Sequence, residues 1–417
     1  MTRRRGLVPV AGAAALGAVF VTLGSFAHAQ IGDFARQERG RYLVAAGDCA
    51  ACHTADDGKP FAGDRPIETP FGTIYSANIT PDPETGIGAW TEEQFYRAMH
   101  EGLAADGRRL YPAFPYPWFT KVTRQDVDDI RAYLRTVAPV RAKPRDNEFI
   151  WPLNHRFAMA AWNGLFFTPG EFQPGKDKSA EWNRGAYLVE GLGHCGACHT
   201  PKNVFGSSKT SDAFQGAEVQ NWFAPNLTGD KRTGLGSWSE EDIVALLKTG
   251  HNARTTAYGP MGAVVKDSTS KLTDQDLQAI ATFLKSLPAF TPNSAGDADQ
   301  KMLSAGKAIY GDDCAACHQL GGEGVERVFP SLRGDAVVQS EEPLSMLRLI
   351  LNGGHAAATP KNPNDKTMPS FGWKLSDEQV AALATYVRNA WGNRAAPVTA
   401  ETVRKLRSST DSVTGAY

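Results

Sequence analysis

The motif Cys-x-x-Cys-His occurs three times in the chain, at residues 49–53, 195–199 and 314–318. In this motif two thiols form thioether bonds to a haem, and the adjacent histidine places an imidazole nitrogen on the iron. The motifs contain all six cysteines of the chain: Cys49, Cys52, Cys195, Cys198, Cys314 and Cys317. The iron ligands are then His53, His199 and His318. The sequence therefore predicts three covalently bound haem c groups.

A Cys-x-x-Cys pair can also belong to a zinc knuckle, a redox dithiol or a disulfide. Here every copy ends in histidine, and no cysteine lies outside the motifs. The flanking sequence is repeated too, because Arg-Gly-x-Tyr-Leu-Val stands at residues 39–44 and again at 184–189. A weaker copy precedes the third motif at residues 305–310. These features favour haem attachment over the three alternatives.

The first 29 residues have the pattern of a secretory signal peptide. Three arginines at positions 3–5 precede an apolar run, and Ala27-His28-Ala29 forms a small-x-small cleavage site. A retained membrane anchor is the alternative, but the run is short and rich in glycine. Export predicts a periplasmic protein. The net charge of −1, without any basic block, argues against a nucleic-acid partner.

The remaining length divides into three units, each of a normal size for a domain. We expect the following organisation: signal peptide 1–29, unit 1 at 30–138, a linker at 139–180, unit 2 at 181–287, a second linker at 288–299, unit 3 at 300–394 and a tail at 395–417. The first linker is rich in aromatic residues, which predicts a segment packed on a domain or partner. The charged tail is expected to be mobile or bound by a partner.

Each unit is predicted to contain three main helices, so the expected fold class is all-α. The first helix carries a glycine ahead of the haem motif, at Gly40, Gly185 and Gly306. The second helix is expected to begin after Thr91 in unit 1 and Ser239 in unit 2, because both residues are good N-caps followed by acids. The closing helices carry apolar residues at helical spacing. The three glycines are expected to let the first and closing helices cross closely.

A methionine thioether is the expected sixth ligand of the second and third irons, and it raises the potential relative to two histidines. Met261 follows Tyr-Gly-Pro, and Met368 lies between Thr367 and Pro369, each in a loop ahead of the closing helix. The alternative is that either methionine is an ordinary core or surface residue.

Unit 1 departs from this pattern, because Phe114 stands where the methionine is expected and phenylalanine cannot bind iron. Aligning Gly102 with Gly250 and Gly353 places Met99 opposite two aliphatic residues, which suggests a core position. His100 aligns with a lysine and a leucine, so it is the preferred candidate for the sixth ligand of the first haem. Met99 is its rival, and an open sixth position is the third possibility.

A ligand histidine needs its second ring nitrogen bonded, because that bond fixes the tautomer and the ring plane. The backbone carbonyl of Pro330 is a candidate acceptor for His318, and that of Pro225 a candidate for His199. Unit 1 has Ala77 at the corresponding position.

The order of these motifs resembles the three-haem cytochrome c subunit of membrane-bound periplasmic dehydrogenases. The resemblance covers essentially the whole mature chain. It rests on Arg-Gly-x-Tyr-Leu-Val, on Asn-Ile/Leu-Thr with Gly-x-Gly-x-Trp at 78–90 and 226–238, on Leu-Tyr-Pro-Ala-x-Pro-Tyr at 110–116, and on the linker segment 149–156. The resemblance implies an all-α fold of three tandem cytochrome c class I domains.

The same resemblance implies a partner, a catalytic dehydrogenase subunit that carries PQQ, FAD or a molybdenum cofactor. Electrons would pass through the haems to ubiquinone or a terminal oxidase. The protein would be attached peripherally to the outer face of the inner membrane. Phe114 differs from the methionine of the alcohol and sugar dehydrogenase subunits, which favours the molybdenum aldehyde dehydrogenase type.

The predicted function is an electron relay without catalytic residues of its own, because the sequence contains no Ser/His/Asp set, P-loop or dinucleotide fingerprint that we can recognise. Two alternatives remain. An open first haem could act as a peroxidase-like enzyme, or the protein could be a soluble electron carrier without a dehydrogenase partner.

Overall fold

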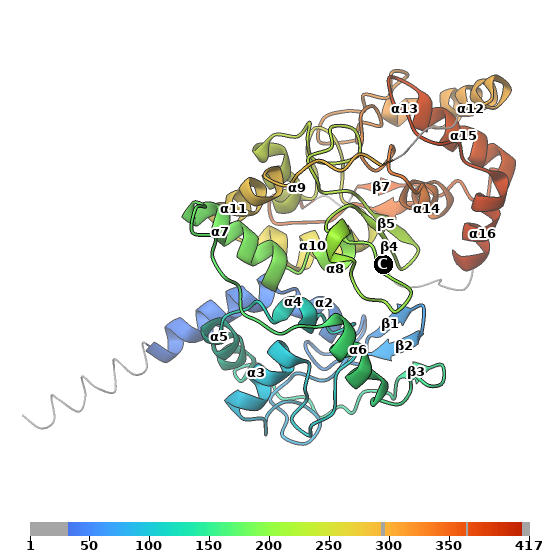
Figure 1. Ribbon diagram of the computed structural model, residues 1–417. Coiled ribbons are helices and arrows are strands. Elements are labelled where there is room, and N and C mark those ends of the chain that lie inside the picture. The colour runs from blue at the N-terminus through green and yellow to red at the C-terminus, as the bar shows by residue number, and fades with distance from the viewer. Residues whose placement is uncertain (1–31, 293–296, 364–365, 411–417) are drawn as a thin grey trace, which may run out of the picture.

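The computed structural model describes residues 32–292, 297–363 and 366–410, so the predicted signal peptide lies outside the described residues. Figure 1 shows unit 1 in blue and cyan on one side of the molecule, with unit 2 in green and yellow and unit 3 in orange and red on the other. Over the described residues, no helix combines the length and the apolar character needed to cross a membrane.

The three units repeat one order of helices. Unit 1 has a helix over residues 32–46, α2 (Cys49–His53), α3 (Glu92–Glu101), α4 (Tyr116–Phe119) and α5 (Arg124–Leu134). Unit 2 has α7 (Ala180–Tyr187) continued by a π-helical turn (Leu188–Leu192), then α8 (Gly196–His199), α9 (Glu240–Thr249), α10 (Gly259–Asp267) and α11 (Asp274–Lys285), with 3₁₀ turns at Thr210–Asp212 and Thr269–Lys271. Unit 3 has α12 (Gln300–Asp313), α13 (Ala315–His318), α14 (Leu344–Asn352), α15 (Asp377–Asn389) and α16 (Ala400–Thr410).

The expected helix starts are confirmed. Thr91 caps α3 and Ser239 caps α9, each in a capping box in which the third helical residue bonds back to the cap backbone. Ser376 caps α15 in the same way. These reciprocal bonds satisfy backbone N–H groups that have no partner inside the helix.

The predicted close helix crossing is present in all three units. A Cβ built on Gly40 would overlap the backbone carbonyl of Asp129 in α5, and one on Gly185 would overlap that of Ala279 in α11. Gly306 meets the carbonyl of Ala382 in α15 in the same way. Only a residue without a side chain lets two helix backbones approach this closely. The glycine therefore determines the angle at which each unit closes over its haem motif.

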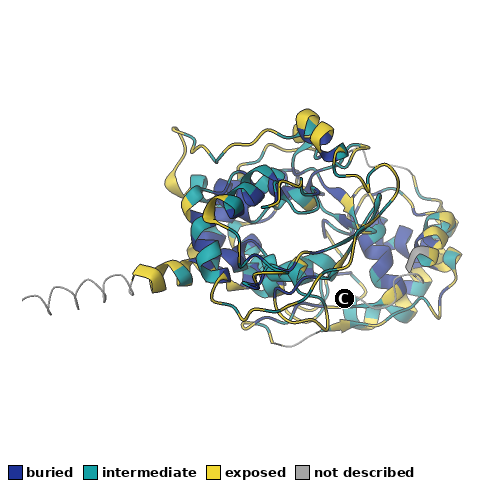
Figure 2. Ribbon diagram, turned by 90° about the horizontal axis from the view of Figure 1, so that it is seen from below, coloured by how far each residue is buried: buried dark blue, intermediate teal, exposed yellow. Residues whose placement is uncertain are grey.

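Short antiparallel strands accompany the helices, a feature that the all-α expectation did not include. They are β1 (Pro66–Thr69), β2 (Gly72–Tyr75) and β3 (Glu148–Phe149) in one sheet, β4 (Ala217–Val219) with β5 (Trp222–Ala224), and β6 (Gly354–His355) with β7 (Thr367–Met368). The loops after the haem motifs of units 1 and 2, and the loop after α14 in unit 3, fold back on themselves, and pairing satisfies their backbone groups. The cores themselves are helical, and Figure 2 shows the buried residues where helices meet and the exposed ones on outer loops.

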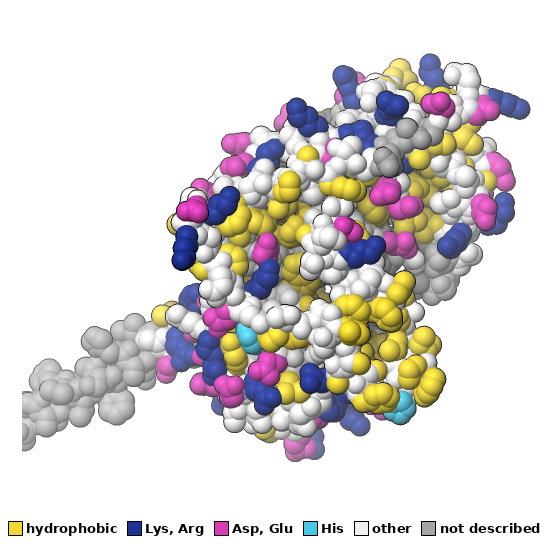
Figure 3. Space-filling model, viewed as in Figure 1, with side chains coloured by type: hydrophobic (Ala, Val, Ile, Leu, Met, Phe, Trp, Pro, Cys, Tyr) yellow, Lys and Arg dark blue, Asp and Glu magenta, His cyan; other side chains and the backbone are white. Residues whose placement is uncertain are grey.

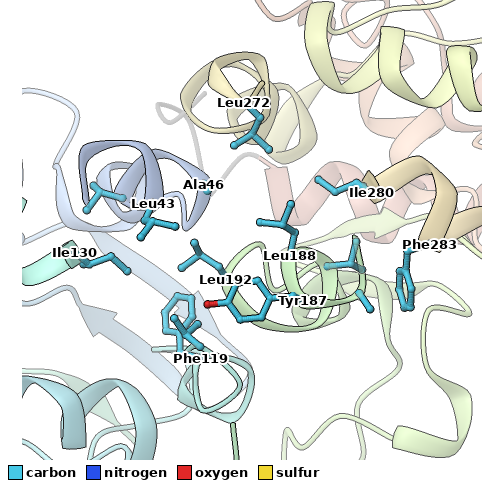
Figure 4. Close-up of a cluster of buried hydrophobic side chains, with 14 of the residues drawn as sticks. Leu43, Ala46, Phe119, Ile130, Tyr187, Leu188, Leu192, Leu272, Ile280 and Phe283 are labelled. Carbon is cyan, nitrogen blue, oxygen red and sulfur yellow. The ribbon is translucent and has the colours of Figure 1, made fainter. Parts of the chain in front are cut away.

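Units 1 and 2 share one hydrophobic core. Figure 4 shows Leu43, Phe119 and Ile130 of unit 1 facing Leu188 and Leu192 of unit 2. Leu192 lies at the end of the π-helical turn after α7, and its side chain has no exposed surface. The residues of unit 3 form a separate cluster around α12, α14 and α15.

Two reciprocal hydrogen bonds join units 1 and 2. The hydroxyl of Tyr42 donates to Asp276 of α11 at 2.6 Å, and the hydroxyl of Tyr187 donates to Asp126 of α5 at the same distance. Each tyrosine comes from the repeated Arg-Gly-x-Tyr sequence and reaches the closing helix of the other unit. Unit 3 has Ala308 at this position, whose side chain cannot donate such a bond. The repeat that marks units 1 and 2 as the closer pair therefore encodes their interface.

The first linker is packed, as expected. Its strand β3 pairs with β2, and α6 (Ala158–Phe166) buries Met159 and Trp162 against Tyr111 and Tyr116 of unit 1. The linker starts are held by two asparagines: Asn78 Nδ2 donates to the Val140 carbonyl at 2.7 Å, and Asn226 Nδ2 to that of Phe290 at 2.9 Å. Both asparagines are buried, so the two Asn-x-Thr sequences have a structural role.

The segment expected as a tail differs from that expectation over residues 395–408. Val398, Val403 and Leu406 are buried in the core of unit 3, where α16 packs on α15. The guanidinium of Arg407 also forms an ion pair with Asp377, at 2.8 Å. The sequence analysis expected a tail because charged and hydroxyl residues predominate in this segment. The segment nevertheless forms an amphipathic helix that is held by a few apolar residues.

Candidate haem sites

Each Cys-x-x-Cys-His motif lies on a short helix, and its histidine makes the same backbone bond in all three units. The Nδ1 atom lies 2.6 Å from the Ala77 carbonyl oxygen for His53, 2.7 Å from that of Pro225 for His199, and 3.0 Å from that of Pro330 for His318. The two expected proline acceptors are confirmed, and Ala77 serves equally well because the acceptor is a backbone carbonyl. Each ring therefore carries its proton on Nδ1 and keeps the Nε2 lone pair for a metal.

Burial keeps these imidazoles neutral. It lowers the pKa of His53, His199 and His318, more than the carbonyl acceptors raise it. A neutral imidazole is the form that binds iron.

Burial raises the pKa of Cys49, Cys195 and Cys314 to about 12. The reactive thiols of redox dithiols have lowered pKa values instead.

A continuous cavity of about 410 Å³ joins the motifs of units 2 and 3. It is lined from unit 2 by Cys195, Cys198, His199 and Met261, and from unit 3 by Cys314, Cys317, His318 and Met368. Most other lining residues are apolar, among them leucines and valines of both closing helices. Two thiols, a neutral histidine and a thioether around an apolar space are the donor set that a haem c requires. The residues present fit the group.

The sequence predicted that the two methionines lie in loops, but Met261 is in the first turn of α10 and Met368 in β7. The segments that lead to them are fixed by backbone bonds. The Ala257 N–H donates to the Gly250 carbonyl at 2.7 Å, which brings the loop before Met261 to the end of α9. In unit 3, Met368 pairs with Gly354, directly after α14. Both methionines are thus placed beside the C-terminus of the second helix, although no feature of the local sequence except proline marks them.

Unit 1 builds the same loop with a different side chain. Its Leu110 N–H donates to the Gly102 carbonyl, also at 2.7 Å, and Phe114 follows Leu110 by four residues, as Met261 follows Ala257. Phe114 is partly buried and packs 5.4 Å from the ring of Phe119. The structure therefore places Phe114 at the position equivalent to that of Met261.

Met99 and His100 point in different directions. The residues equivalent to Met99, which are Leu247 and Ile350, both line the cavity, and Met99 itself is buried in the core that units 1 and 2 share. The ring of His100 is stacked on Tyr96 at 4.9 Å, and its Nδ1 lies 3.4 Å from the Thr120 hydroxyl. Met99 is thus a core residue, as the alignment suggested, and the sixth ligand of the first haem stays a prediction, with His100 preferred and Met99 as its rival.

The motifs of units 1 and 2 lie close together, which sequence reasoning missed. Ala46 and Asp48 of unit 1 line the cavity of unit 2. A Cβ built on Gly196, inside the second motif, would overlap the indole of Trp118. Alanine occupies this position in the other two motifs. The glycine in the second motif was therefore the one sequence feature that could have predicted the close approach of unit 1. The three candidate sites therefore follow one another through the molecule.

These sites contain the residues that a c-type cytochrome uses to hold haem, which are two cysteines and one histidine per motif. The family model for cytochrome c matches residues 37–138, 183–288 and 303–391. The chain belongs to the cytochrome c family.

Individual relatives carry more specific names. The chain is 42% identical to the gluconate 2-dehydrogenase cytochrome c subunit of Pantoea cypripedii, over 89% of each chain. It is 40% identical to the cytochrome c subunit of the quinone-dependent alcohol dehydrogenase of Gluconobacter oxydans, over 95% of this chain and 87% of the relative. It is also 37% identical to the fructose dehydrogenase cytochrome subunit of Gluconobacter japonicus, over 89% of this chain and 82% of the relative.

Proposed function

We propose that this protein is the electron-transfer subunit of a dehydrogenase complex, with three covalent haem c groups in three tandem cytochrome c domains. The observation that carries the proposal is the succession of three equivalent sites, two of them joined by one cavity. The names of the three relatives, all cytochrome subunits of dehydrogenases, support the same conclusion.

The chemistry that haem supplies when bound is reversible one-electron transfer at iron. The chain's residues determine how that chemistry is used. The three carbonyl bonds orient His53, His199 and His318, and the apolar lining excludes water from the sites. Met261 and Met368 are the proposed sixth ligands of the second and third irons. A soft thioether at this position favours the ferrous state and raises the potential.

The proposed partner is a catalytic subunit carrying PQQ, FAD or a molybdenum cofactor. Such a subunit removes two electrons from an alcohol, sugar, aldehyde or N-heterocycle and passes them on singly. The proposed acceptor is ubiquinone or a terminal oxidase. The proposed location is the periplasm, at the outer face of the inner membrane.

Isolation of the holoprotein from membranes of its source tests this function. Mass spectrometry of the chain should give the added mass of three haems, and a large dehydrogenase subunit should co-purify. Substrate of that subunit should then reduce the haems. A chain that carries fewer haems, or that is purified alone and is reduced by no dehydrogenase substrate, would contradict the proposal.

Phe114 supports a second candidate, a peroxidase-like activity at the first haem. A haem without a sixth protein ligand can bind peroxide, and Phe114 occupies the position where units 2 and 3 carry methionine. Peroxide turnover by the isolated holoprotein, absent after Phe114→Met, would establish this activity. No turnover in the unaltered protein would exclude it.

A further inference from the structure

Units 2 and 3 meet at the sides of their sites that carry Met261 and Met368. Ala357 of unit 3 is buried, and it packs in one cluster with Ala257 and Met261 of unit 2. A Cβ built on Gly250, at the end of α9, would lie 3.2 Å from the Ala357 methyl group. The segment between β6 and β7 therefore covers the methionine side of the second site.

Tyr258 lies between the two methionine segments. It is the N-cap residue of α10, three residues before Met261, and both residues line the common cavity. A Cβ built on Gly354 of unit 3 would lie 3.3 Å from Cδ1 of Tyr258, so the tyrosine ring packs against the backbone of Gly354. Gly354 is in turn the strand partner of Met368. One aromatic ring therefore connects the segment of Met261 with the strand that pairs with Met368.

Hydrogen bonds and close packing fix this junction. The Ser345 hydroxyl of α14 accepts from the Phe223 N–H of β5 at 2.9 Å and donates to the Phe223 carbonyl at 3.0 Å. A Cβ built on Gly259, next to Tyr258, would overlap the indole of Trp222 in β5. These contacts are made by uncharged side chains, whereas Figure 3 shows Lys, Arg, Asp and Glu side chains scattered over the visible outer surface. The position of Tyr258 is therefore set by its packing between α10, β5 and β6.

The corresponding tyrosine of unit 1 has different neighbours. Tyr111 stands at the position of Tyr258, but its hydroxyl donates to the Leu153 carbonyl at 2.8 Å, and its ring lies 4.4 Å from that of Phe149. Tyr111 is thus turned toward the first linker. The same position of the repeat packs a linker in unit 1 and joins two sites in unit 2.

We propose that Tyr258 is the bridge through which electrons pass between the second and the third haem. This inference rests on the proposed function and adds to it the path between two of the sites. One electron leaves a ferrous iron and arrives at a ferric iron, while no bond is made or broken and Tyr258 is neither oxidised nor reduced. Electrons tunnel faster along bonded and closely packed atoms than across empty space. A ring packed between the two methionine segments therefore provides the route.

Exchange NMR spectroscopy of the partly reduced, full-length holoprotein tests the proposal, because the haem methyl resonances distinguish the haems. The resonances that shift in Met261→Phe belong to the second haem. Tyr258→Leu should slow electron exchange between the second and third haems several-fold. Tyr258→Phe keeps the ring and should exchange electrons as the unaltered protein does. Tyr111→Leu is the matched control, and it should leave exchange between the second and third haems unchanged.

The haem spectra and potentials separate a bridge from a purely structural role, because they should be the same in Tyr258→Leu as in the unaltered protein. A changed spectrum or potential that accompanies slower exchange would assign Tyr258 a structural role and overturn the proposal. Unchanged exchange in Tyr258→Leu would overturn it too, as would equal slowing in Tyr258→Phe or Tyr111→Leu. The haem content and the co-purified subunit report on the proposed function separately, so the two proposals can fail independently.

Discussion

Units 1 and 2 share a frame and differ at the place where a ligand would bind. Both have the glycine crossing, the histidine–carbonyl bond and the loop bond at the end of the second helix. At the end of that loop unit 2 carries Met261 and unit 1 carries Phe114. The comparison shows that the helix crossing, the histidine–carbonyl bond and the loop bond form whether or not the loop carries a methionine. The backbone bonds that build the loop involve no side chain, so its tip can change.

The facing helix has changed in a complementary way. Counting back from the glycine at each helix end, Ala98 of unit 1 corresponds to Leu246 of unit 2, and Met99 to Leu247. A phenyl ring is bulkier than a methionine side chain, and an alanine opposite it provides room. Such swaps that conserve total volume keep a core packed. Unit 1 therefore has a smaller side chain on this helix and a larger one at the loop tip than unit 2 has.

The largest effect is expected from Met261→Phe, which gives unit 2 the side chain of unit 1. The second haem should lose its thioether ligand, and its potential should fall by on the order of 0.1 V. The near-infrared band of ferric methionine-ligated haem should decrease by one haem equivalent, and carbon monoxide should bind to the new open site. Met159→Leu, in α6, serves as the control and should change neither measurement. A normal band in Met261→Phe would show that Met261 is not a ligand.

The reverse change, Phe114→Met, should make unit 1 resemble unit 2. We expect one more haem equivalent of the near-infrared band and a rise of the first potential, on the order of 0.1 V as well. Potentiometric titration of the holoprotein measures the potential. The gain should be incomplete unless Ala98→Leu is added, because methionine leaves part of the phenyl volume empty. If Phe114→Met changes nothing, the loop tip does not face the iron.

A matched pair of variants decides between Met99 and His100. Each residue is replaced by its counterpart in unit 2, which gives Met99→Leu and His100→Lys. Because the counterparts of Met99 in units 2 and 3 line the cavity and His100 lies beside Thr120, only Met99→Leu should alter the electronic and magnetic circular dichroism spectra of the first haem. A spectral change in His100→Lys alone would support the candidate that the sequence favoured. If neither variant alters the spectra, the sixth position is open.

The smallest effects are expected at the interface that joins the two units. Tyr187→Phe and Tyr42→Phe should each lower the free energy of unfolding by about 1.5–3 kcal/mol, the range for a hydrogen bond to a charged group. Both effects should be similar, because the bonds are reciprocal. Denaturant unfolding measures them. If one variant unfolded the protein and the other left the free energy of unfolding unchanged, the two hydrogen bonds would not be equivalent.

The same interface should depend on pH. Burial raises the pKa of Asp276, but the hydrogen bonds from Arg184 and Tyr42 outweigh this and lower it overall. A carboxyl with a lowered pKa in the folded state stabilises the protein above its unfolded value of about 4, and the contribution is lost as the pH falls below that value. Asp276→Asn should therefore cost stability at pH 7 and much less at pH 3, when unfolding is followed at both pH values.

Several features of this protein were determined by the sequence alone, because they are local or repeated. The haem motifs, the N-caps at Thr91 and Ser239, and the glycines of the helix crossings could all be predicted. Motif spacing, capping and the absence of a side chain act within a few residues or recur at one offset. The proline acceptors of the ligand histidines were predictable for the same reason.

The remaining features were decided by the tertiary structure, because each of them depends on residues that are far apart in the chain. The reciprocal bonds of Tyr42 and Tyr187, the cavity common to units 2 and 3, and the packing of α16 all join distant segments. The same is true of the different directions of Met99 and His100. They are neighbours in the sequence, yet a helix turns each residue by about 100° from the last. Only the position of the surrounding helices determines which of the two faces the haem.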